Sequence, residues 1–189
     1  VTVTGLYTNR YDVTLLVNGL PLVQIELKRR GVDLKEAVNQ IMRYRKHSYQ
    51  GLFHFIQIFV VSNGVDSKYF SNSDKDIFYS NTFFWTDDNN IRITNLKEFS
   101  VVFLARDLLI KMMTKFTVLN DTDKIMMVMR PYQVYAAEAL IRQATMTSRN
   151  AYIWHTTGAG KTLTAFKTAQ ILATNPAIKK VVFLVDRKD

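Results

Sequence analysis

Two acidic residues and a lysine form the first group of side chains whose types and spacing could do chemistry. Glu26 and Lys28 stand two positions apart in a strand-like stretch, so they share one face of that strand. Asp12 precedes them in a second strand-like stretch. The other face of the first stretch is expected to be buried and carries Val23, Ile25 and Leu27. Carboxylates are ligands for Mg²⁺, and an ammonium can position or activate water, so the three residues predict metal-dependent phosphodiester hydrolysis.

The register of a predicted hairpin decides whether the two carboxylates meet. Residues 10–17 and 21–28 are expected to form its strands around the turn Asn18-Gly19. A two-residue loop would pair position 12 with position 25 and leave Asp12 and Glu26 on opposite faces. A three-residue loop would pair Asp12 with Glu26, with Cβ atoms about 4.5–5.5 Å apart. We therefore predict a loop of odd length or an equivalent bulge.

A second chemical motif lies between an apolar stretch and a helical pattern, in His155-Thr156-Thr157-Gly158-Ala159-Gly160-Lys161-Thr162. It has the context of a Walker A loop, although His155 stands where the pattern usually has its first glycine. Backbone N–H groups of Thr157, Gly158, Ala159 and Gly160 can wrap phosphates at a helix N-terminus. Lys161 can bind the β- and γ-phosphates, and Thr162 can hold Mg²⁺. The motif predicts ATP binding.

The elements that position the first group are predicted by periodicity and turn signals. Asp33 and Glu36 indicate the start of a helix that runs to about residue 47, with apolar residues at helical spacing. The remaining expectations are a buried central strand over 53–61, a short strand at 82–86, mostly helix over 96–115 and a linker over 120–124.

Strands and helices alternate after the linker, which predicts a parallel α/β sheet. The expected elements are a strand over 125–128, a helix over 131–144, a strand over 152–155, a helix over 160–173 and a strand over 180–186. We place one domain at 1–124 and a second at 125–189. Both ends of the sequence fall in or beside strand-like stretches, so we expect both domains to be truncated parts of a longer protein.

Composition excludes several classes of protein. The 189 residues contain no cysteine, which removes disulfides, thiol nucleophiles and zinc ribbons and makes the cytoplasm the default location. Membrane spanning is not expected, because no apolar run approaches the length of about 20 residues that a spanning helix needs. Lys and Arg outnumber Asp and Glu by 25 to 16, and the net charge of +9 is compatible with a polyanionic partner.

The first domain resembles the PD-(D/E)XK nuclease superfamily, whose core is a mixed sheet flanked by helices. The resemblance rests on Asp12, on Glu26-Leu27-Lys28 and on a following helix that carries Gln40 and Tyr44. Gln-Ile-Met-Arg-Tyr is similar to the Gln-x-x-x-Tyr motif of the RecB-like branch. The resemblance implies that Asp12, Glu26 and Lys28 are catalytic, with Asp12 and Glu26 as Mg²⁺ ligands, and that Gln40 and Tyr44 assist.

The second domain resembles the beginning of a RecA-like superfamily 2 motor. Arg130-Pro131-Tyr132-Gln133 is similar to the Q motif of these motors, which implies that Gln133 and Arg130 serve ATP together with the phosphate loop. Residues 181–189 resemble motif Ia. The acid of the Walker B motif lies outside the sequence, so we expect these 189 residues alone to lack ATPase activity.

Together the two halves resemble the R (restriction, motor) subunit of type I restriction-modification enzymes. The resemblance implies an ATP-dependent endonuclease that translocates and cleaves duplex DNA, with methyltransferase and specificity subunits as partners. Two alternatives stay open. One is a DNA-repair helicase-nuclease, and the other is a DNA-binding or docking fragment in which the carboxylates form structural ion pairs and Asp12 turns to solvent.

Overall fold

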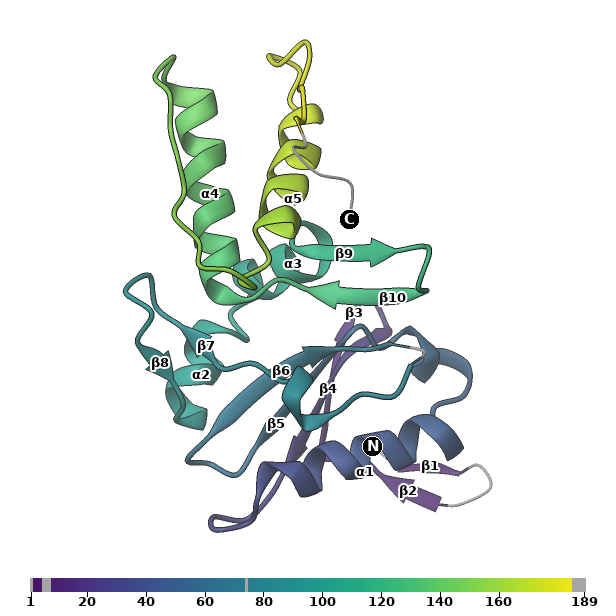
Figure 1. Ribbon diagram of the computed structural model, residues 1–189. Coiled ribbons are helices and arrows are strands. Elements are labelled where there is room, and N and C mark those ends of the chain that lie inside the picture. Colours follow the sequence, from purple (N-terminus) through teal and green to yellow (C-terminus); the bar gives the residue numbers. More distant parts are fainter. Residues whose placement is uncertain (1, 5–7, 74, 185–189) are drawn as a thin grey trace. The chain divides into compact units, whose positions relative to one another are not determined.

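The computed structural model describes residues 2–4, 8–73 and 75–184 of the chain. It divides into two units, Val1–Val128 and Met129–Asp189, which are described separately. The first unit contains a mixed four-stranded sheet in the order β3-β4-β5-β6 (Figure 1). β4 pairs antiparallel with β3 and parallel with β5, and β6 pairs antiparallel with β5. The bounds are β3 Val13–Val17, β4 Leu20–Leu27, β5 Ile58–Ser62 and β6 Ser67–Ser71.

β5 is the buried central strand, as the apolar run predicts, but it is shorter than expected. All five of its residues are buried. Residues Gly51–Phe55 form a 3₁₀ helix, η1, in place of the beginning of the predicted strand. Gly51 has a φ of +57°, which breaks extended backbone at this point.

Helix α1, Leu34–His47, follows β4 and lies along one face of the sheet (Figure 1). Its N-cap is Asp33, as predicted, and the carboxylate accepts the N–H of Lys35 at 2.8 Å. The apolar positions Leu34, Val38 and Ile41 are buried against this face of the sheet. The polar positions Gln40 and Tyr44 are half-buried at the border of the same helix.

The opposite face of the sheet is covered by aromatic side chains from later segments. Tyr69 of β6 lies 4.5 Å from Phe103 between ring centroids, and Trp85 lies 5.2 Å from Phe103. Phe99 extends the same cluster at 4.9 Å from Phe103. The sheet is therefore held from both sides, which fixes the strand that carries Glu26.

The remaining elements of the first unit are short. β1 and β2 form a hairpin, the predicted strand at 82–86 is reduced to β7, and the predicted helical region is split into two helices. The bounds are β1 Thr2–Thr4, β2 Thr8–Arg10, η2 Tyr79–Asn81, β7 Trp85–Thr86, β8 Arg92–Ile93, α2 Leu96–Val102 and α3 Arg106–Thr114.

The predicted linker at 120–124 is a hairpin turn. It joins β9, Thr117–Asn120, to β10, Ile125–Val128, and the two strands pair antiparallel. Asn120 accepts the N–H of Asp123 across the turn, which the polar composition of the segment allows. The strand at 125–128 therefore forms as predicted but belongs to the first unit, so the division between units falls after residue 128.

The second unit contains the two predicted helices, α4 at Pro131–Met146 and α5 at Lys161–Ala173. Pro131 occupies the first turn of α4, a position that suits proline because no intrahelical bond needs its missing N–H. The predicted strands at 152–155 and 180–186 are absent from the described residues of these segments, and residues 185 and 186 lie outside the described part.

The two segments predicted to be strands are exposed and have no neighbouring strand among the described residues, which explains the difference from the predicted parallel sheet. Tyr152 and Trp154 are 85% and 87% exposed, and Leu184 is 93% exposed. A β-strand needs a neighbouring strand for its backbone hydrogen bonds. Within residues 129–184 no strand lies beside either segment, so the alternation of apolar residues alone does not produce a sheet.

Candidate functional site

A bulge in the β3–β4 pair brings Asp12 level with Glu26. The turn has two residues, Asn18 and Gly19, with φ values of 50° and 83°, and it pairs Val17 with Leu20. The register shifts by one residue between the pairs Leu16–Pro21 and Leu15–Val23, so Leu22 is the extra residue. Continued beyond Val13–Ile25, the new register sets position 12 opposite position 26. The predicted bulge is confirmed.

Asp12 lies at a bend between β2 and β3, and its carboxylate is held against β4. Its Oδ2 accepts the backbone N–H of Leu27 at 2.8 Å. Asp12 is exposed as a residue, yet this hydrogen bond fixes it beside the neighbouring Glu26. One carboxylate at the surface and one beneath it thus converge at the end of β4.

Glu26 is buried and only partly satisfied. It is 1% exposed; its Oε1 accepts a hydrogen bond from Lys28 Nζ at 3.1 Å, whereas Oε2 is buried with no hydrogen-bond partner among the described residues. Burial raises the pKa of Glu26 to about 7, and the charge of Asp12 acts in the same direction, while the hydrogen bond from Lys28 opposes them. The second oxygen of this carboxylate is therefore not used by a hydrogen bond within the described residues.

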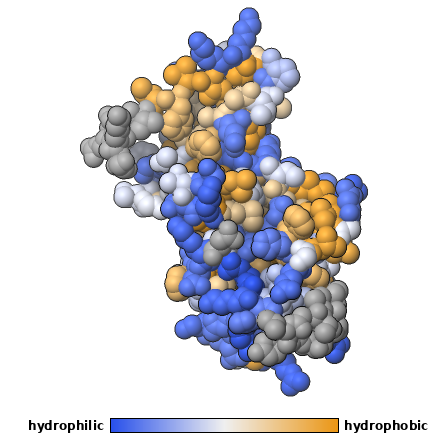
Figure 2. Space-filling model, turned by 90° about the vertical axis from the view of Figure 1, so that its right-hand side faces the viewer, coloured by the Kyte–Doolittle hydropathy of each residue, from blue (hydrophilic) through white to orange (hydrophobic). Residues whose placement is uncertain are grey.

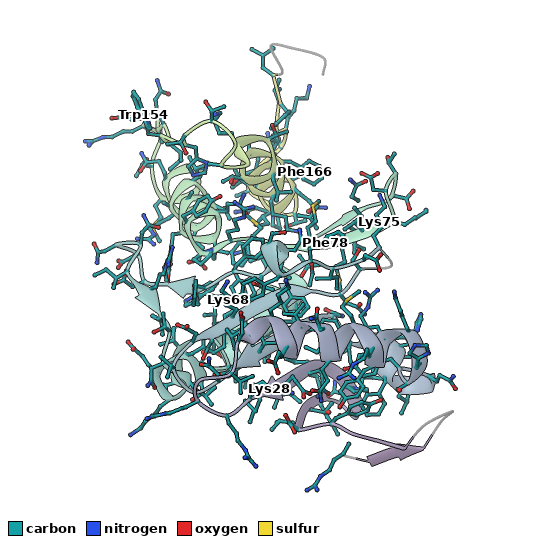
Figure 3. The ribbon with its side chains drawn as sticks, turned by 60° about the horizontal axis from the view of Figure 1, so that its bottom comes forward. Lys28, Lys68, Lys75, Phe78, Trp154 and Phe166 are labelled. Carbon is teal, nitrogen blue, oxygen red and sulfur yellow. The ribbon has the colours of Figure 1, made fainter. Side chains whose placement is uncertain are left out.

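Lys28, Gln40 and Tyr44 form a chain of hydrogen bonds that leads away from Glu26. The Lys28 ammonium also donates to Gln40 Oε1. Gln40 Nε2 donates to the Tyr44 hydroxyl at 2.6 Å, and that hydroxyl donates to the Arg10 carbonyl at 3.3 Å. All five of the residues predicted for this site are therefore brought together, and Figure 3 shows Lys28 beside α1.

The burial of β4 differs from the prediction on both of its faces. Val23 and Ile25 are buried as expected, but Leu27 is 36% exposed, because the strand ends there. The face that carries Glu26 is also buried, and sequence reasoning missed Gln24 on it. Gln24 is fully buried, and its Oε1 accepts the Thr14 hydroxyl at 2.7 Å. Its position two residues before Glu26 on the same strand was the available signal.

The donor set fits a Mg²⁺ ion. In the described part of the chain no cluster of three or more His, Cys, Asp or Glu side chains stands together. Mg²⁺ keeps several of its waters and is typically held by one or two carboxylates, so the pair formed by Asp12 and Glu26 is sufficient. The unpartnered, buried Oε2 of Glu26 is the observation that supports this fit.

The predicted phosphate loop of the second unit, residues 155–162, has a left-handed glycine at the start of α5. Gly158 and Gly160 each have a φ of +77°, a conformation that favours glycine, and Gly160 is the N-cap of α5. Lys161 Nζ donates to the Thr156 carbonyl at 3.2 Å, across the loop. Thr157, Gly158, Lys161 and Thr162 are all exposed, and the N–H of Ala159 donates to the Thr156 carbonyl at 3.3 Å within the loop.

The start of α4 is joined to this loop through Ala159. The Ala159 carbonyl accepts the Tyr132 hydroxyl at 2.8 Å and Gln133 Nε2 at 3.1 Å. Gln133 is 3% exposed, and its Oε1 accepts the N–H of Arg130 at 2.9 Å. Both ends of the Gln133 amide are thus engaged within the protein, while Arg130 is exposed and donates to the Tyr132 hydroxyl. Tyr132 has a direct loop contact that sequence reasoning missed.

Comparison with known proteins finds two restriction-enzyme families, one matching the N-terminal part of the chain and one the C-terminal part. Residues 1–77 match the family described as type I restriction enzyme R protein N terminus, and residues 126–189 match the type III restriction enzyme, res subunit. The whole chain is 60% identical to the type I restriction enzyme SsaAORF53P endonuclease subunit of Staphylococcus saprophyticus. It is 58% identical over its whole length to the SauCOLORF180P endonuclease subunit of Staphylococcus aureus.

A third relative extends the similarity beyond the staphylococci. The EcoprrI endonuclease subunit of Escherichia coli is 46% identical over 143 residues, which are 72% of this chain and 45% of that protein. The chain spans 20% of the length of each of the two staphylococcal proteins. None of the helices in the described part is both long and apolar enough to cross a membrane.

Proposed function

This chain belongs to the R subunits of type I restriction enzymes, and on that premise we propose that it supplies the nuclease site and the ATP-binding loop of an ATP-dependent, DNA-translocating endonuclease. The substrate of the nuclease site is the phosphodiester bond of duplex DNA. The observation that carries this proposal is the buried, unpartnered Glu26 Oε2 beside Asp12 and Lys28.

Each residue of the nuclease site has a proposed role. Asp12 and Glu26 would hold Mg²⁺, which, when bound, would supply positive charge to the phosphate and lower the pKa of a bound water. Lys28 orients the attacking water near the phosphate through its ammonium. Gln40 holds that ammonium in place, and Tyr44 holds Gln40, because the three side chains are joined by hydrogen bonds.

The phosphate loop has a proposed role in ATP binding. Backbone N–H groups from Thr157 to Gly160 surround the phosphates, Lys161 offers its ammonium and Thr162 its hydroxyl. Arg130, which is exposed, stays a proposed contact of the nucleotide. Gln133 is proposed to act through the loop, because its amide is hydrogen-bonded to Ala159 and Arg130.

The partners proposed for the full-length protein are duplex DNA and the methyltransferase and specificity subunits of a type I complex. We propose that the full-length protein acts in the cytoplasm, where duplex DNA would be its substrate. A docking fragment with structural ion pairs is less well supported, because the ion pair of Glu26 with Lys28 leaves the second carboxylate oxygen of Glu26 buried without a partner among the described residues. The positive net charge of +9 suits a polyanionic substrate.

Substitution of Glu26 in the full-length protein tests this proposal. With its partner subunits, ATP and Mg²⁺, we expect Glu26→Gln to lower the rate of duplex DNA cleavage at least about a hundredfold, because a neutral amide binds Mg²⁺ weakly. Glu98→Gln, on α2, removes the same charge from an exposed position and should cleave like the wild type. Cleavage at the wild-type rate by Glu26→Gln would refute the proposed site.

A further inference from the structure

A polar groove opens directly beside the proposed nuclease site. One wall is the end of β4 and the residues after it, including Lys28 and Arg29, and the other is one side of α1, including Asn39, Gln40 and Arg43. Lys28 and Gln40 belong to both the groove and the site, so the groove is continuous with the place where the phosphodiester is expected to lie. It is formed entirely within the first unit.

The helix wall of the groove is a regular stripe. Asn39 and Arg43 are four residues apart, and Gln40 and Arg43 are three apart, so their side chains project from the same side of α1. Glu36 begins the stripe one turn nearer to the start of the helix. The stripe from residue 36 to residue 43 is about 10 Å long, which leaves room for more than one phosphate of a strand.

Two guanidinium groups of the groove are available to a ligand. Arg29 and Arg43 are exposed, and neither side chain makes an ion pair or hydrogen bond within the described part of the chain. Lys28 differs, because its ammonium is already engaged with Glu26 and Gln40. On the face of the molecule drawn in Figure 2, most of the coloured residues in the lower part are hydrophilic.

We propose that Arg29 and Arg43 bind phosphates of the DNA strand that is cut, next to the scissile phosphodiester. A guanidinium can bind a phosphate through two parallel hydrogen bonds, and contacts of this type set the register of a nucleic acid without reading its sequence. The Asn39 amide, which lines the same groove, offers a further donor. This inference rests on the proposed nuclease function and adds residues that hold the substrate to those that act on it.

Glu36 is the one acidic residue among those that line the groove, and it stands at the end of the α1 stripe away from Arg43. Its carboxylate repels phosphate, so along α1 the end of the stripe at Arg43 favours a phosphate more than the end at Glu36.

The test compares two double variants of the full-length protein with equal loss of charge. Arg29→Gln/Arg43→Gln removes both groove guanidiniums. Arg30→Gln/Lys35→Gln removes two neighbouring exposed charges that do not line the groove. Duplex cleavage is measured at sub-saturating DNA from low to high salt, with ATP, Mg²⁺ and partner subunits, and DNA-stimulated ATP hydrolysis is followed in the same samples. Asp12→Ala is measured alongside.

We expect the groove variant to cleave about tenfold or more slowly than the control near physiological salt, with unchanged ATP hydrolysis. The dependence of log rate on log salt should become shallower by about two, one for each lost phosphate contact. Arg29→Lys/Arg43→Lys keeps the charges and should retain the wild-type slope. Equal rates and slopes for the groove variant and the control would overturn the inference. If Asp12→Ala also cleaves normally, the proposed nuclease function itself fails.

Discussion

At the scale of single residues, the site is defined by a conflict between burial and charge at Glu26. A buried carboxylate with one unpartnered oxygen is destabilising, and its pKa is raised accordingly. Lys28 offsets part of this cost, but Asp12 adds to it. We propose that Glu26 is retained despite this cost because its carboxylate is a ligand for Mg²⁺.

This conflict predicts a pH-dependent difference in stability between the wild type and Glu26→Gln without divalent ions. The pKa of Glu26 is raised from 4.5 to about 7 in the folded protein, so the unfolded protein binds fewer protons between these values and wild-type stability falls as pH rises through them. At pH 8 the variant should be more stable by up to about 3 kcal/mol, and at pH 4.5 the two should be nearly equal.

Denaturant unfolding of both proteins at the two pH values measures this difference. Addition of Mg²⁺ at pH 8 should stabilise the wild type and leave the variant almost unchanged. A variant that is less stable than the wild type at pH 8 would show that Glu26 is held by interactions that favour its ionised form.

At the scale of elements, local signals predicted the parts that position the proposed nuclease site. The Asn18-Gly19 turn, the Asp33 cap and the apolar run of β5 each act through neighbouring residues, and each appears in the structure. The sequence indicated that a bulge is needed to bring Asp12 opposite Glu26, but it did not indicate at which residue the bulge lies. Pro21 marks its place in retrospect, because proline has no N–H for the ladder and is accommodated at bulges.

Predictions from sequence were wrong where the structure of a segment depends on residues far away in the chain. The segment around Trp154 reads as a strand but is exposed, since strand formation depends on a neighbour that the local sequence does not specify. The same reason applies to 120–124, where a polar stretch fits a linker and a hairpin turn equally well. The hydrogen bonds of Gln133 to Ala159 and Arg130 depend on tertiary packing and could not be read from the motif.

The phosphate loop yields a prediction about two glycines that share one conformation. Both Gly158 and Gly160 have a φ of +77°, so alanine is strained at either position, by about 1–2 kcal/mol. A Cβ on Gly160 would also come 2.5 Å from Gln133 Nε2, whereas one on Gly158 would meet no heavy atom within 4 Å. Gly160→Ala should therefore lower the melting temperature of the protein more than Gly158→Ala.

Thermal unfolding of the two variants in the full-length protein measures this effect. In a Gln133→Ala background the additional loss caused by Gly160→Ala should shrink, because the clashing amide is gone. Equal destabilisation by the two alanines, with no coupling to Gln133, would show that the hydrogen bond of Gln133 to the loop does not confine Gly160.

At the scale of the whole molecule, we propose that the chain carries two separate functions in its two units. Residues proposed to cut DNA are confined to the first, and residues proposed to bind ATP are confined to the second. Residues 1–77 match one restriction-enzyme family and residues 126–189 match another, so the two matches lie almost entirely in different units. The central claim is that each unit contributes a separate site to one enzyme and that cutting depends on both.

The most direct measurement of this claim is Mg²⁺-dependent cleavage of circular duplex DNA by the full-length protein with its partner subunits and ATP. Wild type, Asp12→Ala and Lys161→Ala are compared, with ATP hydrolysis followed in parallel. Asp12→Ala should stop cutting and leave ATP hydrolysis unchanged, whereas Lys161→Ala should stop both. Normal cutting by Asp12→Ala would contradict the account, because the β3–β4 hairpin would then be structural and the hydrolytic site would lie elsewhere.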